Sequence, residues 1–117
     1  MNEKFSVKFL SDVIDFLDSL DEKSRDKIIY NIYKVKTTND IELFKKLTNE
    51  IWEYRTLFNK SFYRLLAFWD STDNEQTLVI ATNGFIKKTK KTPKAEIEKA
   101  KAIRKIYFEQ KIRNKKK

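Results

Sequence analysis

The spacing of apolar residues changes at about Ile51, and this change constrains the fold more than any other feature of the 117-residue chain. From Leu10 to Tyr33 the apolar residues recur every three or four positions, as on helices; from Ile51 they alternate or run together, as in strands. The first part predicts a helical hairpin joined near Leu20–Asp21, with Ser11 or Asp12 capping the first helix and Asp21 the second. Its two stripes, both expected to be core, are Leu10, Val13, Ile14, Leu17 and Leu20, then Ile28, Ile29, Ile32 and Tyr33.

Four segments have the patterns of strands: Lys4–Phe9, Ile51–Phe58, Phe62–Trp69 and Leu78–Phe85, the last nearly continuous in apolar residues and therefore central. In the second of them Trp52, Tyr54, Thr56 and Phe58 face one way, and Glu53 and Arg55 the other. Thr92 and Pro93 are the expected cap and first residue of a last helix, whose apolar stripe is Ile97, Ala100, Ile103 and Tyr107.

These elements predict a single α+β domain over residues 1–112. It has a short N-terminal strand, a helical hairpin, a curved antiparallel sheet of about four strands and a C-terminal helix. Residues 113–117 are expected to form a flexible basic tail.

The residue types present exclude several kinds of chemistry. Cysteine and histidine are both absent, so there is no thiolate nucleophile, disulfide framework or histidine acid–base catalyst. No group of carboxylates has metal-ligand spacing, so neither a metal nor another cofactor is expected. No apolar run is long enough to cross a bilayer and the N-terminus lacks a signal-peptide pattern, so we expect a soluble, cytoplasmic protein.

Positive charge is concentrated in the last third of the chain. From Gln76 onward there are 14 lysines and arginines against 3 acidic residues, whereas the preceding 75 residues carry 12 basic and 14 acidic ones. The net charge of +9 therefore comes entirely from the C-terminal part. This asymmetry favours a polyanionic partner, because phosphate neutralisation supplies much of the affinity for nucleic acids. A solubilising surface would have the same composition.

A two-residue turn at Asn59-Lys60 would place Arg55 directly opposite Arg64 on neighbouring strands. Like charges in this position are unfavourable unless an anion lies between them, and the planar fork of arginine suits phosphate oxygens. In one alternative Arg55 pairs with Glu53 or Glu50 and Arg64 only reaches to solvent. In another, a three-residue loop sets Arg64 opposite Thr56.

The segment from Asn83 to Pro93 gathers several features that bind phosphate. Gly84, the only glycine of the chain, stands where a strand ends and permits a bulge or a close backbone approach. Four lysines follow it and lead into the start of the last helix, where free N–H groups and the helix dipole favour anions. A solvated basic loop would account for the lysines but not for their position at a strand end.

Three stretches resemble the phage-derived, HigB-like branch of the RelE/ParE toxin superfamily. They are Ile51-Trp52-Glu53-Tyr54-Arg55, Phe62-Tyr63-Arg64-Leu65-Leu66 and Gly84-Phe85-Ile86-Lys87-Lys88-Thr89-Lys90-Lys91-Thr92-Pro93. Glu96, Ile97 and Ala100 continue the third match, and Phe16–Leu20 resembles the end of the family's first helix, so the resemblance covers nearly the whole chain. Relatives often carry His just before the glycine, where this chain has Asn83, so an acid–base role at that position is not implied.

The resemblance implies the toxin of a type II toxin–antitoxin system, an endoribonuclease (mRNA interferase) that cleaves mRNA on the ribosome without a metal. The expected catalytic residues are Arg64, Lys87, Lys88, Lys90 and Tyr107, and the expected RNA-binding residues are Arg55, Lys60, Lys91 and Lys94. Without histidine, a lysine whose pKa is lowered by neighbouring cations is the expected base. Arg64 is expected to hold the transition-state charge. The acid and the base stay unassigned among Lys87, Lys88, Lys90 and Tyr107.

The implied partners are a cognate antitoxin, commonly a helix-turn-helix DNA-binding protein, together with mRNA and the ribosome. Two other classes of function remain open. A ParE-like toxin would inhibit DNA gyrase and leave mRNA intact. A non-catalytic RNA-binding protein would bind RNA with a steep salt dependence and would not be toxic on expression.

Overall fold

A computed structural model describes residues 5–38, 40, 42–72, 77–87 and 91–115. Its elements are β1 (Ser6–Phe9), α1 (Ser11–Asp18), α2 (Glu22–Thr38), β2 (Phe44–Lys46), β3 (Trp52–Phe58), β4 (Ser61–Asp70), β5 (Leu78–Lys87) and α3 (Lys94–Lys115). The predicted α+β class and order of elements are confirmed, with β2 as an additional strand. Within the described residues, no helix is both long enough and apolar enough to span a membrane.

Five strands form one sheet in the order β1-β5-β4-β3-β2. The neighbours β2, β3, β4 and β5 are antiparallel, whereas β1 runs parallel to β5, so the sheet is mixed rather than purely antiparallel as predicted. The direction of β1 depends on a partner strand more than 70 residues away in sequence, as in the pair Ser6 and Leu78. No local pattern reports such a pairing.

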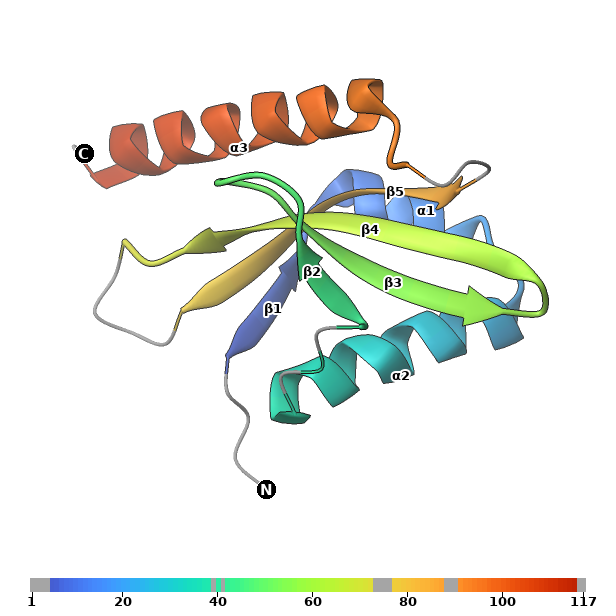
Figure 1. Cartoon of the computed structure of the whole chain (residues 1–117). Helices are drawn as coiled ribbons and strands as arrows, with labels where there is room; N and C mark the ends of the chain where they lie inside the picture. Colours follow the sequence, from blue (N-terminus) through green and yellow to red (C-terminus); the bar gives the residue numbers. More distant parts are fainter. Residues whose placement is uncertain (1–4, 39, 41, 73–76, 88–90, 116–117) are drawn as a thin grey trace.

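The sheet lies between two helical layers, with α1 and α2 on one face and α3 on the other (Figure 1). Each face has its own core, because successive residues of a strand point to opposite sides. The core under α1 and α2 contains Phe5, Val13, Leu17, Ile28, Ile32, Val35, Phe44, Tyr54, Tyr63, Leu65, Ala67, Val79 and Ala81. The smaller core under α3 contains Ile51, Leu66, Phe68, Ile80 and Ala100.

The helical hairpin forms as predicted, with differences at its caps and on its outer face. Asp21 caps α2, since its carboxylate accepts hydrogen bonds from the Ser24 backbone N–H (3.1 Å) and hydroxyl (2.6 Å). For α1 the predicted side-chain cap is wrong: the capping position is Leu10, which makes no side-chain cap. Ile29 and Tyr33, predicted to be core, are 44% and 58% exposed, because α2 contacts the sheet along a narrower stripe.

The connection between β3 and β4 is the two-residue turn that the sequence predicts. Asn59 and Lys60 both have positive φ, 51° and 66°, as a type I′ turn requires. Phe58 therefore pairs with Ser61, and Arg55 lies directly opposite Arg64. The alternative register, with Arg64 opposite Thr56, is excluded.

An irregularity in β5 changes which side chains face α3. The pairing with β4 shifts between Leu66 and Ala67, which leaves Thr82 as an extra residue in β5. Beyond this bulge Asn83 and Lys87 lie opposite Leu66 and Phe62. Because one inserted residue reverses the alternation of a strand, the bulge puts Lys87 on the α3 side of the sheet.

Gly84 allows α1 to approach the sheet closely. A Cβ atom at this position would lie 2.3 Å from Cδ2 of Phe16 and 2.7 Å from Cδ2 of Leu65, which is too close for any side chain. A close approach at Gly84 is thus present, but it is made by the side chains of Phe16 and Leu65 rather than by backbone. The bulge of β5 lies at Thr82 instead, and the strand continues past Gly84 to Lys87.

The last helix begins and ends differently from the prediction. The Pro93 carbonyl accepts hydrogen bonds from the N–H groups of Glu96 and Ile97, so Pro93 rather than Thr92 is the capping residue. Thr92 instead donates its hydroxyl hydrogen bond to Glu53 of β3. α3 continues to Lys115, so the tail predicted from residue 113 starts as part of the helix.

Candidate phosphate-binding groove

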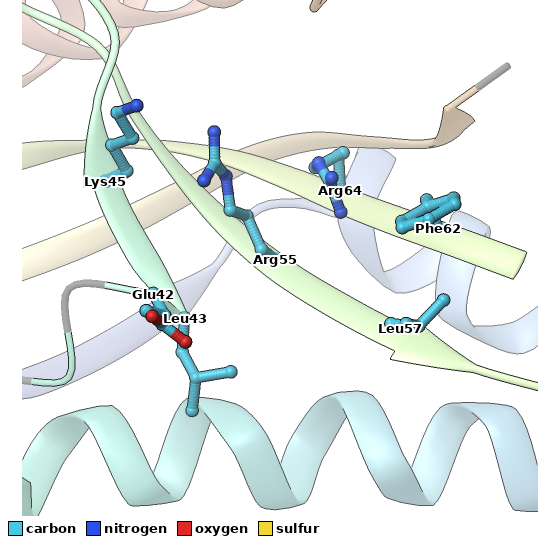
Figure 2. A pocket seen from close by; sticks show the side chains of 7 residues that line it. All are labelled: Glu42, Leu43, Lys45, Arg55, Leu57, Phe62 and Arg64. Carbon is cyan, nitrogen blue, oxygen red and sulfur yellow. The ribbon is translucent and has the colours of Figure 1, made fainter. Parts of the chain in front are cut away.

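The face of the sheet under α3 is covered at one end and open at the other. α3 packs over the part of β4 and β5 around Phe68 and Ile80, whereas the β3–β4 hairpin extends past the start of the helix (Figure 1). The open part forms a groove of about 550 Å³, here called the basic groove. It is lined by Glu42, Leu43, Lys45, Arg55, Leu57, Phe62 and Arg64. Figure 2 shows Lys45, Arg55 and Arg64 rising from the sheet on the side away from α2.

Arg55 and Arg64 are directly opposed in the groove and share one carboxylate. Oε1 of Glu53 lies 3.0 Å from Nε of Arg55 and 3.4 Å from Nε of Arg64. Glu53 is fully buried, so the pairing acts where solvent screens it little. The predicted pair of arginines and the predicted Arg55–Glu53 ion pair are therefore both present, and the carboxylate lowers the cost of holding two guanidinium groups together.

Arg64 is nearly buried, and only part of its hydrogen-bonding capacity is used. It is 8% exposed, and its Nη1 donates a hydrogen bond of 3.1 Å to the Tyr63 carbonyl. Its Nε lies at ion-pair distance from Glu53 but has no hydrogen-bond acceptor within the described part of the chain. Burial lowers the pKa of Arg64, Glu53 opposes this shift and Arg55 adds to it. Arginine stays protonated even so, and it presents a fixed cation to an anion in the groove.

Lys87 adds a cation with altered acidity beside the groove. It ends β5 directly opposite Phe62 and faces the same side of the sheet as Arg64. Burial lowers the pKa of Lys87, and the positive charges of Arg64, Arg55 and Lys45 lower it further, against an opposing effect of Glu53. A lysine with a lowered pKa is neutral more often at a given pH, which is the property required of a base.

Residues 15–105 match the model of the family described as "Phage derived protein Gp49-like", which is more than half of the chain. The chain belongs to this Gp49-like family. A chain of the structure described as "Crystal structure of the intact E. coli RelBE toxin-antitoxin complex" is similar to it, with a TM-score of 0.50 and 18% sequence identity. The alignment covers 74% of the Gp49-like chain and 99% of the RelBE chain.

At 18% identity the likeness to the RelBE chain concerns the fold alone, and it confirms the RelE-like fold that the sequence motifs implied. The family match confirms the resemblance to a phage-derived family that the same motifs indicated. No curated protein matches the chain. The region matched by the family model contains the three cations that line the groove, Lys45, Arg55 and Arg64, and Lys87 beside it, whereas Tyr107 lies beyond this region.

The structure of the Gp49-like protein does not bring Tyr107 to the groove. Its hydroxyl donates a 2.5 Å hydrogen bond to Asp70, which also accepts one of 2.6 Å from Lys111. Asp70 ends β4, six residues after Arg64, a separation of about 20 Å along a strand. Tyr107 thus attaches α3 to the covered end of the sheet.

Three further predicted residues that the structure describes, Lys60, Lys91 and Lys94, do not line the groove. Lys60 is exposed in the β3–β4 turn, and Lys91 and Lys94 are exposed where the chain enters α3. Lys88 and Lys90 lie outside the described residues.

Several contributors to the site were not predicted. Lys45 comes from β2, whose three residues are too few to show a period. The sequence indicates Glu53 only as a partner of Arg55, because its contacts to Arg64 and Thr92 depend on the fold. Asn83, where relatives often have His, is 1% exposed and donates a 3.0 Å hydrogen bond to Glu96 of α3. Asn83 therefore connects β5 to the helix and does not line the groove.

Proposed function

We propose that this Gp49-like protein is the toxin of a toxin–antitoxin pair and that it cleaves mRNA in the basic groove. The proposal rests on the opposed pair Arg55 and Arg64, which the buried carboxylate of Glu53 holds in place. Lys87 lies beside this pair on the next strand. Four cations around one open groove suit an RNA phosphate. The RelE-like fold supports the proposal, since the solved relative is part of a toxin–antitoxin complex.

Cleavage by the RNA's own 2′-hydroxyl fits the groups in the groove. The 2′ oxygen loses its proton and attacks the adjacent phosphorus, and the bond from phosphorus to the 5′ oxygen breaks. The products are a 2′,3′-cyclic phosphate and a 5′-hydroxyl, which takes up a proton from a lysine ammonium of the groove or from water. Lys87 is the proposed base because its pKa is lowered.

The arginines act on the phosphate itself. Arg64, held by the Tyr63 carbonyl and Glu53, is the proposed stabiliser of the charge that grows on the phosphate oxygens. Arg55 is more exposed and positions the backbone. Arg55, Arg64 and Lys87 do not by themselves position a long RNA. We therefore propose that the ribosome presents the mRNA in a fixed geometry, which increases the rate of cleavage.

A neutralising antitoxin is part of the same proposal. An acidic antitoxin segment would suit the basic groove, because its carboxylates would take the place of RNA phosphates on Arg55 and Arg64. Such a segment would block the groove without any change in the fold.

The experiment adds purified protein to a translation extract that contains a defined mRNA and maps cuts by primer extension. We expect discrete cuts with the natural chain and with Lys34→Ala, a matched loss of charge on the exposed side of α2. Arg64→Ala should abolish the cuts while the circular dichroism spectrum stays unchanged. Intact mRNA together with inhibition of gyrase supercoiling would instead favour a ParE-like toxin, and intact mRNA without toxicity an RNA-binding protein.

A further inference from the structure

Two large apolar side chains are exposed at the rim of the basic groove. Leu57 is 58% exposed and Phe62 is 45% exposed. They are direct partners across β3 and β4, two residues along their strands from Arg55 and Arg64. All four side chains therefore lie on the same face of the hairpin, with an apolar pair next to a cationic pair.

The fold does not use this apolar pair. Neither side chain belongs to the two cores, and α3 does not cover them. Phe62 is also surrounded by cations, since Lys87 lies opposite it on β5 and the guanidinium carbon of Arg64 is 5.6 Å from its ring centroid. An exposed aromatic ring amid cations is the composition of surfaces that bind single-stranded nucleic acid.

We propose that Phe62, supported by Leu57, stacks against one unpaired base of the RNA whose phosphate binds Arg55 and Arg64. This inference rests on the proposed function and names a further contact with its substrate. Two residues along a strand span about 6.6 Å, so a phosphate at the arginines leaves its own nucleotide within reach of the ring. Every base has a π-face, so the contact requires an unstacked base but not a particular one.

The test is binding of a short 2′-O-methyl RNA, which lacks the attacking hydroxyl, measured by fluorescence anisotropy over a range of salt concentrations. Phe62→Ala should weaken binding by about tenfold, whereas Phe62→Trp should restore it. The slope of affinity against salt should not change in Phe62→Ala, because no phosphate contact is lost. Arg55→Ala should lower that slope by about 1. Tyr30→Ala is the matched control, since Tyr30 is 59% exposed on α2.

A series of oligonucleotides that each lack one base locates the contact. One abasic position should weaken binding to the natural chain and have no effect on Phe62→Ala, since the two losses report the same interaction. Equal affinity of Phe62→Ala and the natural chain, or no binding of this RNA by the natural chain, would overturn the stacking contact. If stacking is found but the translation extract shows no cuts, the proposed nuclease activity fails and the binding site stands.

Discussion

Arg55 lies directly opposite Arg64 across β3 and β4, and both guanidinium groups meet the same oxygen of Glu53. Two opposed arginines would ordinarily weaken a strand pair. Here the buried carboxylate holds them in place and also accepts a hydrogen bond from Thr92, just before α3. One residue thus organises the cations of the groove and attaches the start of the last helix to the sheet.

Glu53→Gln should destabilise the protein, because it leaves the nearly buried Arg64 without its counter-charge while the glutamine can still accept from Thr92. We expect the free energy of unfolding to fall by about 2–3 kcal/mol. This loss is smaller than for a fully buried ion pair, because Arg55 is 30% exposed. Urea unfolding measures the loss. Glu50→Gln, which removes an exposed partner of Arg104, should cost about 0.5 kcal/mol or less. Equal effects of the two variants would contradict this role of Glu53.

Arg64→Lys separates the charge of Arg64 from its shape. The lysine keeps a cation but loses the planar fork, so phosphate gripping by two donors is lost. We expect cleavage in the translation extract to slow by about 10²-fold, as for the loss of one transition-state donor. Arg55→Lys should have a smaller effect because Arg55 is more exposed. Full activity of Arg64→Lys would show that charge alone suffices.

The pH dependence of cleavage should follow Lys87. Its pKa lies below the ordinary value of 10.5 because of burial and neighbouring cations, so the neutral, base-competent form becomes available at lower pH. Cleavage should rise with pH through this lowered pKa and then level off. Lys45→Met removes one of the neighbouring cations and should move the rise to higher pH, whereas Lys34→Met should not. An unchanged pH profile in Lys45→Met would argue against Lys87 as the base.

Tyr107→Phe tests whether the last helix contributes chemistry or only packing. The ring keeps its contacts with Phe68 and Phe108, whereas the hydrogen bond to Asp70 is lost. We expect a loss of about 1.5–3 kcal/mol in stability, as for a hydrogen bond to a charged group, and an unchanged cleavage rate. A large fall in the cleavage rate of a correctly folded Tyr107→Phe variant would instead support a catalytic role for Tyr107.

Asp70 also makes the stability of the fold depend on pH. Burial raises its pKa, but hydrogen bonds from Lys111, Tyr107 and Thr72 outweigh burial and hold the pKa well below 3.8. A carboxylate with a lowered folded-state pKa stabilises the fold above its unfolded pKa and loses this contribution as pH falls toward the folded value. Unfolding curves should therefore show weaker acid destabilisation below about pH 4 in Asp70→Asn than in the natural chain.

Much of the groove could be predicted because its basis is local. The Asn59-Lys60 turn sets the pairing of the strands on either side, and alternation along β3 places Glu53 and Arg55 on one face. The single glycine, Gly84, indicates a crowded position, whereas the side chains that crowd it, Phe16 and Leu65, come from other elements. The sequence therefore determined the helical hairpin, the faces of the central strands and the opposition of Arg55 and Arg64, since turn geometry and side-chain period act between near neighbours.

Tertiary structure alone decided how these pieces combine. The bulge at Thr82 puts Lys87 beside Arg64, and β1 pairs with a strand from the other end of the chain. Glu53 bonds to Thr92, 39 residues away, and Asp70 holds Tyr107 at the covered end of the sheet, 37 residues away. Contacts across such separations depend on how whole elements pack, and no periodicity within an element records them. For that reason the arginine pair was predictable, whereas its buried carboxylate link to α3 and the position of Tyr107 away from the groove were not.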